Sequence, residues 1–198
     1  MALSARFTEA LVFAAQLHRA QRRKGPAEIP YLAHLLAVAG TVIEHGGTEE
    51  EAIAALLHDA VEDQGGLSTR ETILRLFGPE VTEIIDGSTD ATVSPKPPWR
   101  ERKERFLARL ATAPASIQLV VLADKLSNVR STIRDLRQFG GEIWNRFRGG
   151  EQGTLWYYRA VVKTIRPADA RSAALHRELE LAVRELESLA AQATQPGT

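Results

Sequence analysis

The sequence predicts an all-α protein. Apolar residues recur every three or four positions in most segments, and this spacing places them on one face of a helix. Such a stripe near the C-terminus consists of Leu175, Leu179, Val183, Leu186 and Leu189. No segment of useful length alternates between apolar and polar residues, which is the pattern expected of a strand. We therefore expect a bundle of helices.

The composition limits the class of protein. The chain has 198 residues, enough for one domain with a full core, and its 25 Lys plus Arg balance 25 Asp plus Glu. This balance favours neither nucleic acid nor a membrane as partner. No apolar stretch approaches the roughly 20 residues of a membrane span, and a signal-peptide pattern is absent, so we expect a cytoplasmic protein. Without Cys, any metal site must use His, Asp, Glu and water.

The first helix is expected from Ser4 to Arg23, with a basic C-terminal end that stops at Gly25-Pro26. The basic end has two interpretations. Cations are favourable at a helix C-terminus because of the helix dipole. Alternatively, Arg23 and Lys24 turn inward and hold phosphate, for which the planar guanidinium of arginine is well shaped.

Two further helices carry histidine. The second helix is apolar apart from His34, and a single imidazole in such a helix is more often a hydrogen-bonded core residue than a ligand. Thr48 and Glu51 have the spacing of a capping box and should open the third helix. That helix runs through apolar residues and ends in His58-Asp59.

The middle of the chain is more polar. A loop with three prolines is expected from Asp90 to Pro98, followed by a charged helix from Trp99 to Leu110. Mixed charges at this spacing usually face solvent. The alternative is that Arg102 or Lys103 reaches into a neighbouring site.

Pro114 should open a long helix in which Asp124 interrupts an apolar run. An unpaired buried carboxylate is costly, so Asp124 is either a ligand or has a partner nearby. Lys125 is the adjacent cation, but neighbouring residues on a helix do not face one another. Asn128, one turn further on, shares the face of Asp124.

The C-terminal part begins with a glycine-rich stretch, 140–153, which we interpret as a mobile loop or short helix near a pocket mouth. The next helix carries Tyr157 and Tyr158, aromatic residues that suit a core as well as a ligand-binding surface. The chain is then assigned in three parts: a main domain at 1–165, a helix at 166–193 that packs on the domain or on a second subunit, and a disordered tail at 194–198.

Ionisable residues inside apolar sequence are the strongest functional signal. They occur on three helices, as His34, His58-Asp59 and Asp124. Taken alone, His58-Asp59 is more simply a helix end with acidic residues facing water. Taken together, two imidazoles and two carboxylates suit one octahedral cation such as Mn, Fe, Co or Zn, with water in the open positions.

Two acidic residues follow the His-Asp pair. Glu62 lies four residues after His58, and Asp63 lies four residues after Asp59, so both pairs share a face if the helix continues. A carboxylate beside a metal-bound water can accept its proton. This combination predicts hydrolytic chemistry on an anionic substrate.

This order of residues resembles the HD-domain phosphohydrolases. The resemblance extends to the hydrolase domain of the RelA/SpoT alarmone enzymes, and especially to the small single-domain alarmone hydrolases, over roughly 7–163. The matching stretches are Phe13–Arg19 with Arg22–Lys24, Pro30–His34, Leu56–Asp63 and Leu122–Arg130.

The resemblance implies a bundle of about ten helices in a single domain. It also implies one Mn ion, with His34, His58, Asp59 and Asp124 as its ligands. The implied activity is removal of pyrophosphate from the 3′ position of guanosine tetra- or pentaphosphate, with Glu62 and Asp63 positioning or activating the attacking water. The residues expected to contact the guanine nucleotide are Arg23, Lys24, Lys103, Asn128 and one or both of Tyr157 and Tyr158.

The chain departs from the family beside its first ligand, where Ala33 and Leu35 replace the usual Asn and Pro. No synthetase segment is present in the sequence, so we expect hydrolysis to be its only alarmone activity. Two alternatives stay open: a hydrolase for another nucleotide or a 3′-phosphorylated cofactor, and a binding module without turnover. The C-terminal helix also permits a homodimer.

Overall fold

The computed structural model describes residues 2–25, 28–90 and 97–193, and within them it confirms the all-α prediction. These residues form nine α-helices and one 3₁₀ helix, close to the expected ten. The elements are α1 (Ala5–Leu17), α2 (Leu32–Glu44), α3 (Glu49–Leu57), α4 (Ala60–Asp63), α5 (Leu67–Ser88), α6 (Trp99–Leu110), α7 (Ala115–Phe139), η1 (Gly140–Arg146), α8 (Gly150–Thr164) and α9 (Ala170–Ala193). The expected tail and most of the proline loop lie outside the described residues.

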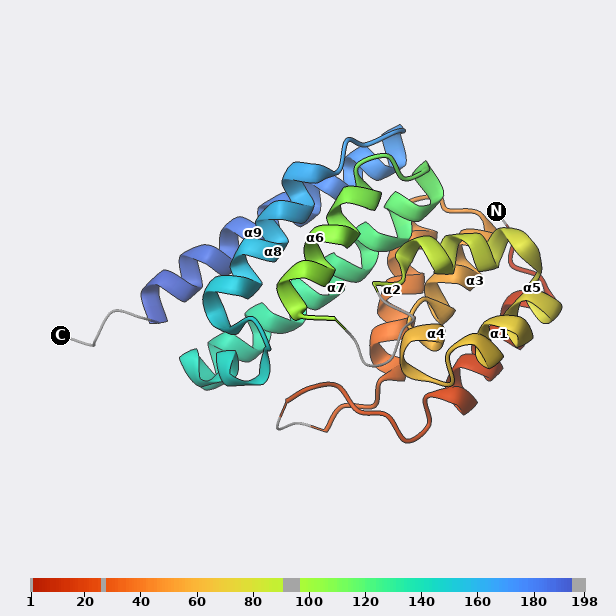
Figure 1. The fold of residues 1–198 in the computed structure, drawn as a ribbon, viewed down its shortest axis with the longest axis horizontal. Coiled ribbons are helices and arrows are strands. Elements are labelled where there is room, and N and C mark those ends of the chain that lie inside the picture. Colours follow the sequence, from red (N-terminus) through yellow and green to blue (C-terminus); the bar gives the residue numbers. More distant parts are fainter. Residues whose placement is uncertain (1, 26–27, 91–96, 194–198) are drawn as a thin grey trace.

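Helix α7 runs through the middle of the molecule and joins its two halves. Helices α1 to α5 lie on one side of it, and α6, α8 and α9 lie on the other (Figure 1). The apolar stripe of α9 packs along α7 within the same chain, with Leu175, Leu179 and Leu186 fully buried. None of the described helices combines the length and apolar character needed to cross a lipid bilayer.

Helix α3 forms the centre of the first half and is buried along almost its whole length, from Glu51 to Leu57. The predicted capping box opens it. The backbone N–H of Glu51 donates to Thr48 Oγ1 at 3.2 Å, and the backbone N–H of Thr48 donates to a Glu51 carboxylate oxygen at 2.7 Å. Because the helix is fixed at its start and packed on all sides, its last residues are delivered to a defined position.

The prediction that the first helix reaches Arg23 is wrong, because α1 ends at Leu17. The residues after it fold back as a narrow loop instead. The backbone N–H of Arg23 donates to Ile29 O at 2.8 Å, and that of Tyr31 donates to Gln21 O at 3.0 Å. These bonds turn the basic segment away from the helix axis and toward α7.

The helix also does not run on through the His-Asp pair. His58 ends α3, Asp59 has φ −97° and ψ −2°, and α4 then covers only four residues. The helix is thus interrupted at His58 and Asp59, the two residues whose side chains enter the site. Glu62 and Asp63 therefore belong to a separate short helix rather than to the face of α3.

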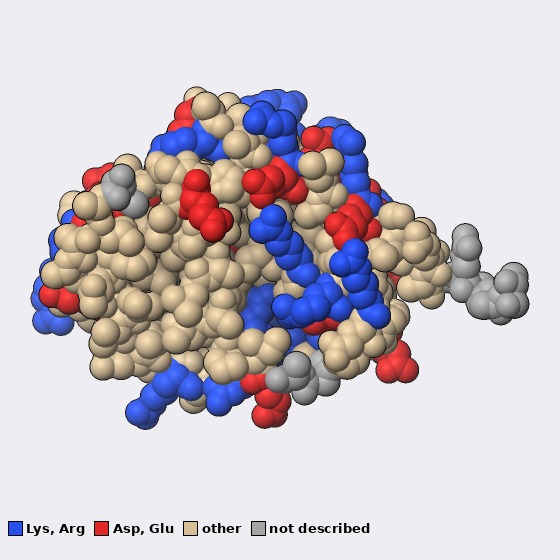
Figure 2. Space-filling model, turned by 180° about the vertical axis from the view of Figure 1, so that it is seen from behind, with Lys and Arg blue, Asp and Glu red and all other residues tan. Residues whose placement is uncertain are grey.

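Charged side chains on one side of the molecule are mixed in sign. On the face seen from behind, they gather over the half that carries α7 and α9, and the other half shows few of them (Figure 2). Pairs across the α7–α9 seam include Arg130–Glu178 at 3.1 Å and Arg137–Glu185 at 2.6 Å. This face therefore offers no field of a single sign, in agreement with the balanced composition.

Candidate active site

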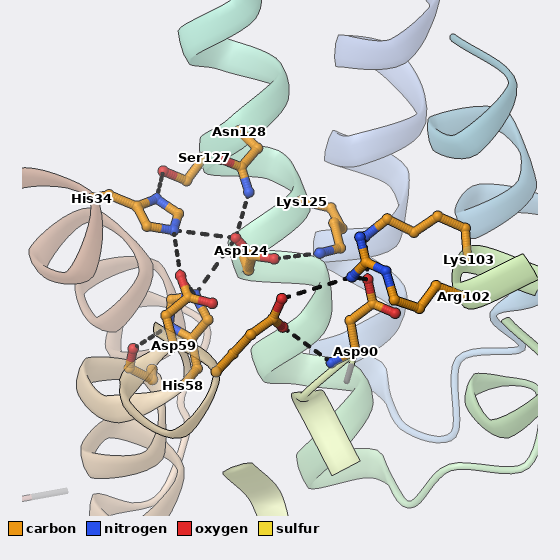
Figure 3. Close-up of polar contacts among 12 residues, drawn as sticks. His34, His58, Asp59, Asp90, Arg102, Lys103, Asp124, Lys125, Ser127 and Asn128 are labelled. Atoms are coloured by element: carbon orange, nitrogen blue, oxygen red, sulfur yellow. Dashed lines mark hydrogen bonds and ion pairs between the residues drawn. The ribbon is translucent and has the colours of Figure 1, made fainter. Parts of the chain in front are cut away.

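The four predicted ligands come together from α2, the end of α3 and α7 (Figure 3). His34 Nε2 lies 3.2 Å from Asp124 Oδ1 and 3.7 Å from Asp59 Oδ2. His58 Nε2 lies 2.9 Å from Asp59 Oδ2 and 3.6 Å from Asp124 Oδ1. We call these four residues the His-Asp cluster.

Each imidazole is held through its other nitrogen. His58 Nδ1 donates to the backbone oxygen of Ala55 at 2.8 Å, and His34 Nδ1 bonds Ser127 Oγ at 3.0 Å. Ser127 thus supports His34 although the neighbouring family residues are replaced. Both Nε2 atoms are buried and make no well-formed hydrogen bond within the described residues. Imidazoles fixed at Nδ1 with Nε2 presented are typical of metal ligands.

The carboxylates are also supported by neighbours. Asp59 Oδ2 accepts from the Tyr31 hydroxyl at 2.6 Å. Asp124 accepts from Asn128 Nδ2 and from Lys125 Nζ, each at 2.5 Å. The expectation that Lys125 points away from Asp124 is wrong, because the long lysine side chain bends back to the carboxylate. These partners orient the oxygens toward the two imidazoles.

The cluster attracts positive charge. Burial would lower the pKa of His58, yet Asp59 and Asp124 raise it well above its ordinary value. Burial would raise the pKa of Asp59, but His58 holds it well below its ordinary value. Burial likewise opposes ionisation of Asp124, but Lys125 and the two imidazoles keep its pKa well below its ordinary value. A divalent cation can supply the same positive charge when it displaces the imidazole proton.

The donor set fits such a cation. One ligand atom each from His34, His58 and Asp59 lies within 4.8 Å of the others, and Asp124 reaches the same two nitrogens. Mixed nitrogen and oxygen ligands suit the divalent first-row metals. The residues present therefore fit a divalent metal ion.

The two acidic residues that follow the His58-Asp59 pair lie near the His-Asp cluster, and other parts of the chain hold both of them. Glu62 Oε2 accepts from the backbone N–H of Asp90 at 3.3 Å, and Glu62 Oε1 lies 3.7 Å from Arg102 Nη1. Asp63 Oδ2 accepts from Gln21 Nε2 at 2.8 Å. Both carboxylates are thus held by groups from distant parts of the chain.

A cavity of about 510 Å³ opens over the His-Asp cluster. Asp59 and Asp124 line it, while the two imidazoles lie buried behind them. All the residues predicted to contact substrate also line it: Arg23, Lys24, Lys103, Asn128, Tyr157 and Tyr158. The structure therefore brings together every predicted site residue, including both tyrosines.

Basic side chains face the cluster across this cavity. Arg23 Nη2 donates to Asn128 Oδ1 at 2.9 Å, and Lys103 Nζ lies 4.5 Å from the centre of the Tyr157 ring. Burial, together with the charge of Lys125, lowers the pKa of Lys103. We call Arg23, Lys24 and Lys103 the cationic wall. A cavity with a cation site on one side and fixed cations on the other suits a phosphorylated ligand.

Comparisons with known proteins agree with this geometry. The family model described as HD domain matches residues 10–155, which is most of the chain. The chain belongs to the HD domain family. Within this HD family it is similar to the guanosine-3′,5′-bis(diphosphate) 3′-pyrophosphohydrolases MESH1 of Xenopus tropicalis and of Homo sapiens. The first is 39% identical over 80% of this chain and 83% of its own length, and the second is 32% identical over 92% and 93%.

The chain is also similar in fold to a solved structure. It is that of a metazoan ortholog of SpoT, which hydrolyses ppGpp and plays a role in starvation responses. It is 32% identical in sequence, covers 93% of this chain and 97% of its own, and has a TM-score of 0.77. The HD fold expected from the sequence is therefore confirmed.

The HD pocket also contains residues to which sequence reasoning gave no role. Gln21 holds Asp63, Tyr31 holds Asp59, and Asp90 accepts from Arg102 at 2.5 Å and from Lys103 at 2.7 Å. None of the three interrupts an apolar run, so hydrophobic pattern gave no signal for them. Arg102 and Lys103 both line the pocket, as the alternative held, so the interpretation of the α6 charges as a solvent-facing set is wrong for these two residues.

Proposed function

We propose that this HD-family chain is a metal-dependent hydrolase that removes pyrophosphate from the 3′ position of guanosine tetra- or pentaphosphate. The observation that carries the proposal is the convergence of the His-Asp cluster on one side of a cavity and fixed cations on the other. The similarity to MESH1 over most of both chains supports the same activity. The products are GDP or GTP and pyrophosphate.

The cation would be held by His34, His58, Asp59 and Asp124, and we propose that it is Mn²⁺. Nitrogen and oxygen ligands without thiolate suit Mn, Fe, Co or Zn, and carboxylate and water ligands are the ones that Mn prefers. When bound, the cation lowers the pKa of a coordinated water and neutralises charge on the phosphate. Ser127, Ala55, Tyr31 and Asn128 fix the ligand atoms so that little reorganisation is needed.

Glu62 and Asp63 are the proposed water-handling residues. Their carboxylates lie at the cavity edge beside the cluster, and each accepts a hydrogen bond that fixes it. A carboxylate so held can accept the proton of the attacking water, and general-base help of this kind contributes about 10²–10⁴-fold. The water oxygen forms a bond to the phosphorus attached to the 3′ oxygen, and the bond between that phosphorus and the 3′ oxygen breaks. The 3′ oxygen takes up a proton as it leaves.

The cationic wall is proposed to hold the phosphates. Arg23 is oriented by Asn128, and Lys103 is held between Asp90 and the Tyr157 ring, so both cations are in place before substrate arrives. Cations fixed in a partly buried pocket stabilise developing phosphate charge more than mobile surface cations do. Tyr157 and Tyr158 line the same cavity and can contact the nucleoside.

The test is turnover by pure protein. We expect incubation with MnCl₂ and ppGpp to give GDP and pyrophosphate, and chelation to stop the reaction. A panel with pppGpp, dNTPs, 5′-nucleotides and 3′-phosphorylated cofactors should show the highest kcat/KM for the guanosine 3′-diphosphates. Tight ppGpp binding by calorimetry with no product at high enzyme concentration would instead establish a binding module.

A further inference from the structure

A second group of buried charges lies beside Glu62. Its members are Asp90, two residues after α5, and Arg102 and Lys103 on α6 (Figure 3). Arg102 Nη1 donates to Asp90 Oδ2 at 2.5 Å, and Lys103 Nζ donates to the same oxygen at 2.7 Å. Arg102 is only 8% exposed. A guanidinium removed from water in this way is strongly committed to its carboxylate partners.

This group contacts both oxygens of the Glu62 carboxylate. The backbone N–H of Asp90 donates to Oε2 at 3.3 Å, and Arg102 Nη1 lies 3.7 Å from Oε1. Glu62 itself stands on α4, a helix of four residues that leaves its long side chain several rotamers. Contacts from outside α4 must therefore select the rotamer.

Arginine suits this position better than lysine. One guanidinium nitrogen, Nη1, faces both carboxylates and can direct one of its two N–H groups at each of them. A guanidinium also stays charged when it is buried and is less strongly hydrated than an ammonium. Of the Asp90 and Glu62 carboxylates, the ammonium of Lys103 contacts only that of Asp90. Arg102 and Lys103, adjacent on α6, therefore make different contacts, and Asp90 fixes the position of Arg102.

We propose that Arg102, anchored by Asp90, is a positioning residue that holds the Glu62 carboxylate where it accepts a proton from the attacking water. This rests on the proposed hydrolase function. In this step the proton passes from the water oxygen to a Glu62 oxygen, and Arg102 keeps its own protons. Arg102 acts through Glu62 and does not bind phosphate.

A kinetic cycle tests this. It compares wild type, Glu62→Gln, Arg102→Gln and the double variant with MnCl₂ and ppGpp. We expect Arg102→Gln to lower kcat by about 10–100-fold with KM changed less than about threefold, and to change kcat less than about threefold in the Glu62→Gln background. A raised KM, or effects that multiply in the double variant, would overturn the proposal, and so would full activity of Glu62→Gln.

The controls separate positioning from folding. Arg105→Gln makes the same change on the same helix at an exposed ion pair with Glu101, and it should leave kcat unchanged. Arg102→Lys keeps the charge without the guanidinium and should recover part of kcat. Thermal unfolding and metal content are measured for each variant, and the cycle is run with Arg102→Lys if Arg102→Gln does not fold.

A second readout does not depend on turnover. If wild type binds Mn²⁺ but does not hydrolyse ppGpp, the proposed function is wrong, and the same four proteins are compared by urea unfolding. Contact between Arg102 and Glu62 predicts that their effects on the unfolding equilibrium are not multiplicative, because removing either partner already breaks the pair. Independent effects would show that Arg102 does not position Glu62.

Discussion

The two sides of the pocket are built from different kinds of chain. The His-Asp cluster comes from α2, α3 and α7, which meet in the core, and its two imidazoles are almost fully buried. The cationic wall comes from the loop after α1 and from α6, which lie outside the central helices α3 and α7. A metal ion requires its ligand atoms at closely defined positions, and the packed core can hold the His-Asp cluster in this way. The cationic wall only has to bring positive charge near the phosphates. The following variants should therefore differ in severity.

The largest effect is expected from Asp124→Asn. The change removes one anionic ligand and leaves Lys125 without its carboxylate partner. We expect metal affinity to fall by more than about 100-fold, turnover to disappear, and unfolding free energy to drop by about 3 kcal/mol. Metal analysis after dialysis and urea unfolding measure these quantities.

Asp86→Asn is the matched control for Asp124→Asn. Asp86 pairs with Arg70 at 2.5 Å, but both side chains are about one-third exposed and neither lines the cavity. Its loss should cost at most about 1 kcal/mol and leave metal binding unchanged. Normal metal content in Asp124→Asn would show that the core side does not depend on this ligand.

Glu62→Gln should separate metal binding from chemistry. The amide keeps the shape of the side chain but cannot accept the water proton. We expect metal content and KM to stay near wild type while kcat falls by about 10²–10⁴-fold. Glu104→Gln, at an exposed pair with Arg100, is the control and should have wild-type kcat. Wild-type kcat in Glu62→Gln would assign the water-handling role elsewhere.

The same contrast explains what the sequence could predict. His34 and Asp124 each interrupt an apolar run, so pattern and the cost of buried charge marked them as candidates, and their combination with His58-Asp59 favoured a shared cation. Asp90 lies in a segment without periodicity and Gln21 in one that was expected to be helical, and the contacts of both depend on how distant segments pack on one another. The end of the first helix was misplaced because Arg19–Arg23 contains good helix formers, and loop pairing overrode that local preference.

A smaller effect is expected on the cationic wall. Arg23 bonds Asn128 and faces the cavity, so its loss removes a contact made in both ground and transition states. We expect Arg23→Ala to raise KM about tenfold, the amount that corresponds to about 1.4 kcal/mol, with kcat changed less than about twofold. Arg19→Ala, an exposed cation outside the cavity lining, should have no effect. A large fall in kcat with unchanged KM would mean that Arg23 acts only in the transition state.

The smallest effects should distinguish the two tyrosines. The Tyr157 hydroxyl is buried and has no hydrogen-bond partner among the described residues, whereas the Tyr158 side chain lies beside Thr132 of α7. Removing an unpaired buried hydroxyl costs no protein contact, so Tyr157→Phe should be as stable as wild type or slightly more stable. If that hydroxyl is kept for the nucleotide, KM for ppGpp should rise by about threefold to tenfold.

Tyr158→Phe is the reciprocal variant. It should lose at most about 1 kcal/mol of unfolding free energy, because Thr132 keeps its hydrogen bond to Asn128 O at 2.9 Å, and its KM should stay at the wild-type value. Steady-state kinetics and urea unfolding of the two variants decide between them. Two residues adjacent in sequence would then divide the work, with one hydroxyl stabilising α8 against α7 and the other facing substrate. Equal KM values in both variants would show that neither hydroxyl distinguishes the tyrosines in nucleotide binding, which would leave only their aromatic rings to contact the nucleotide.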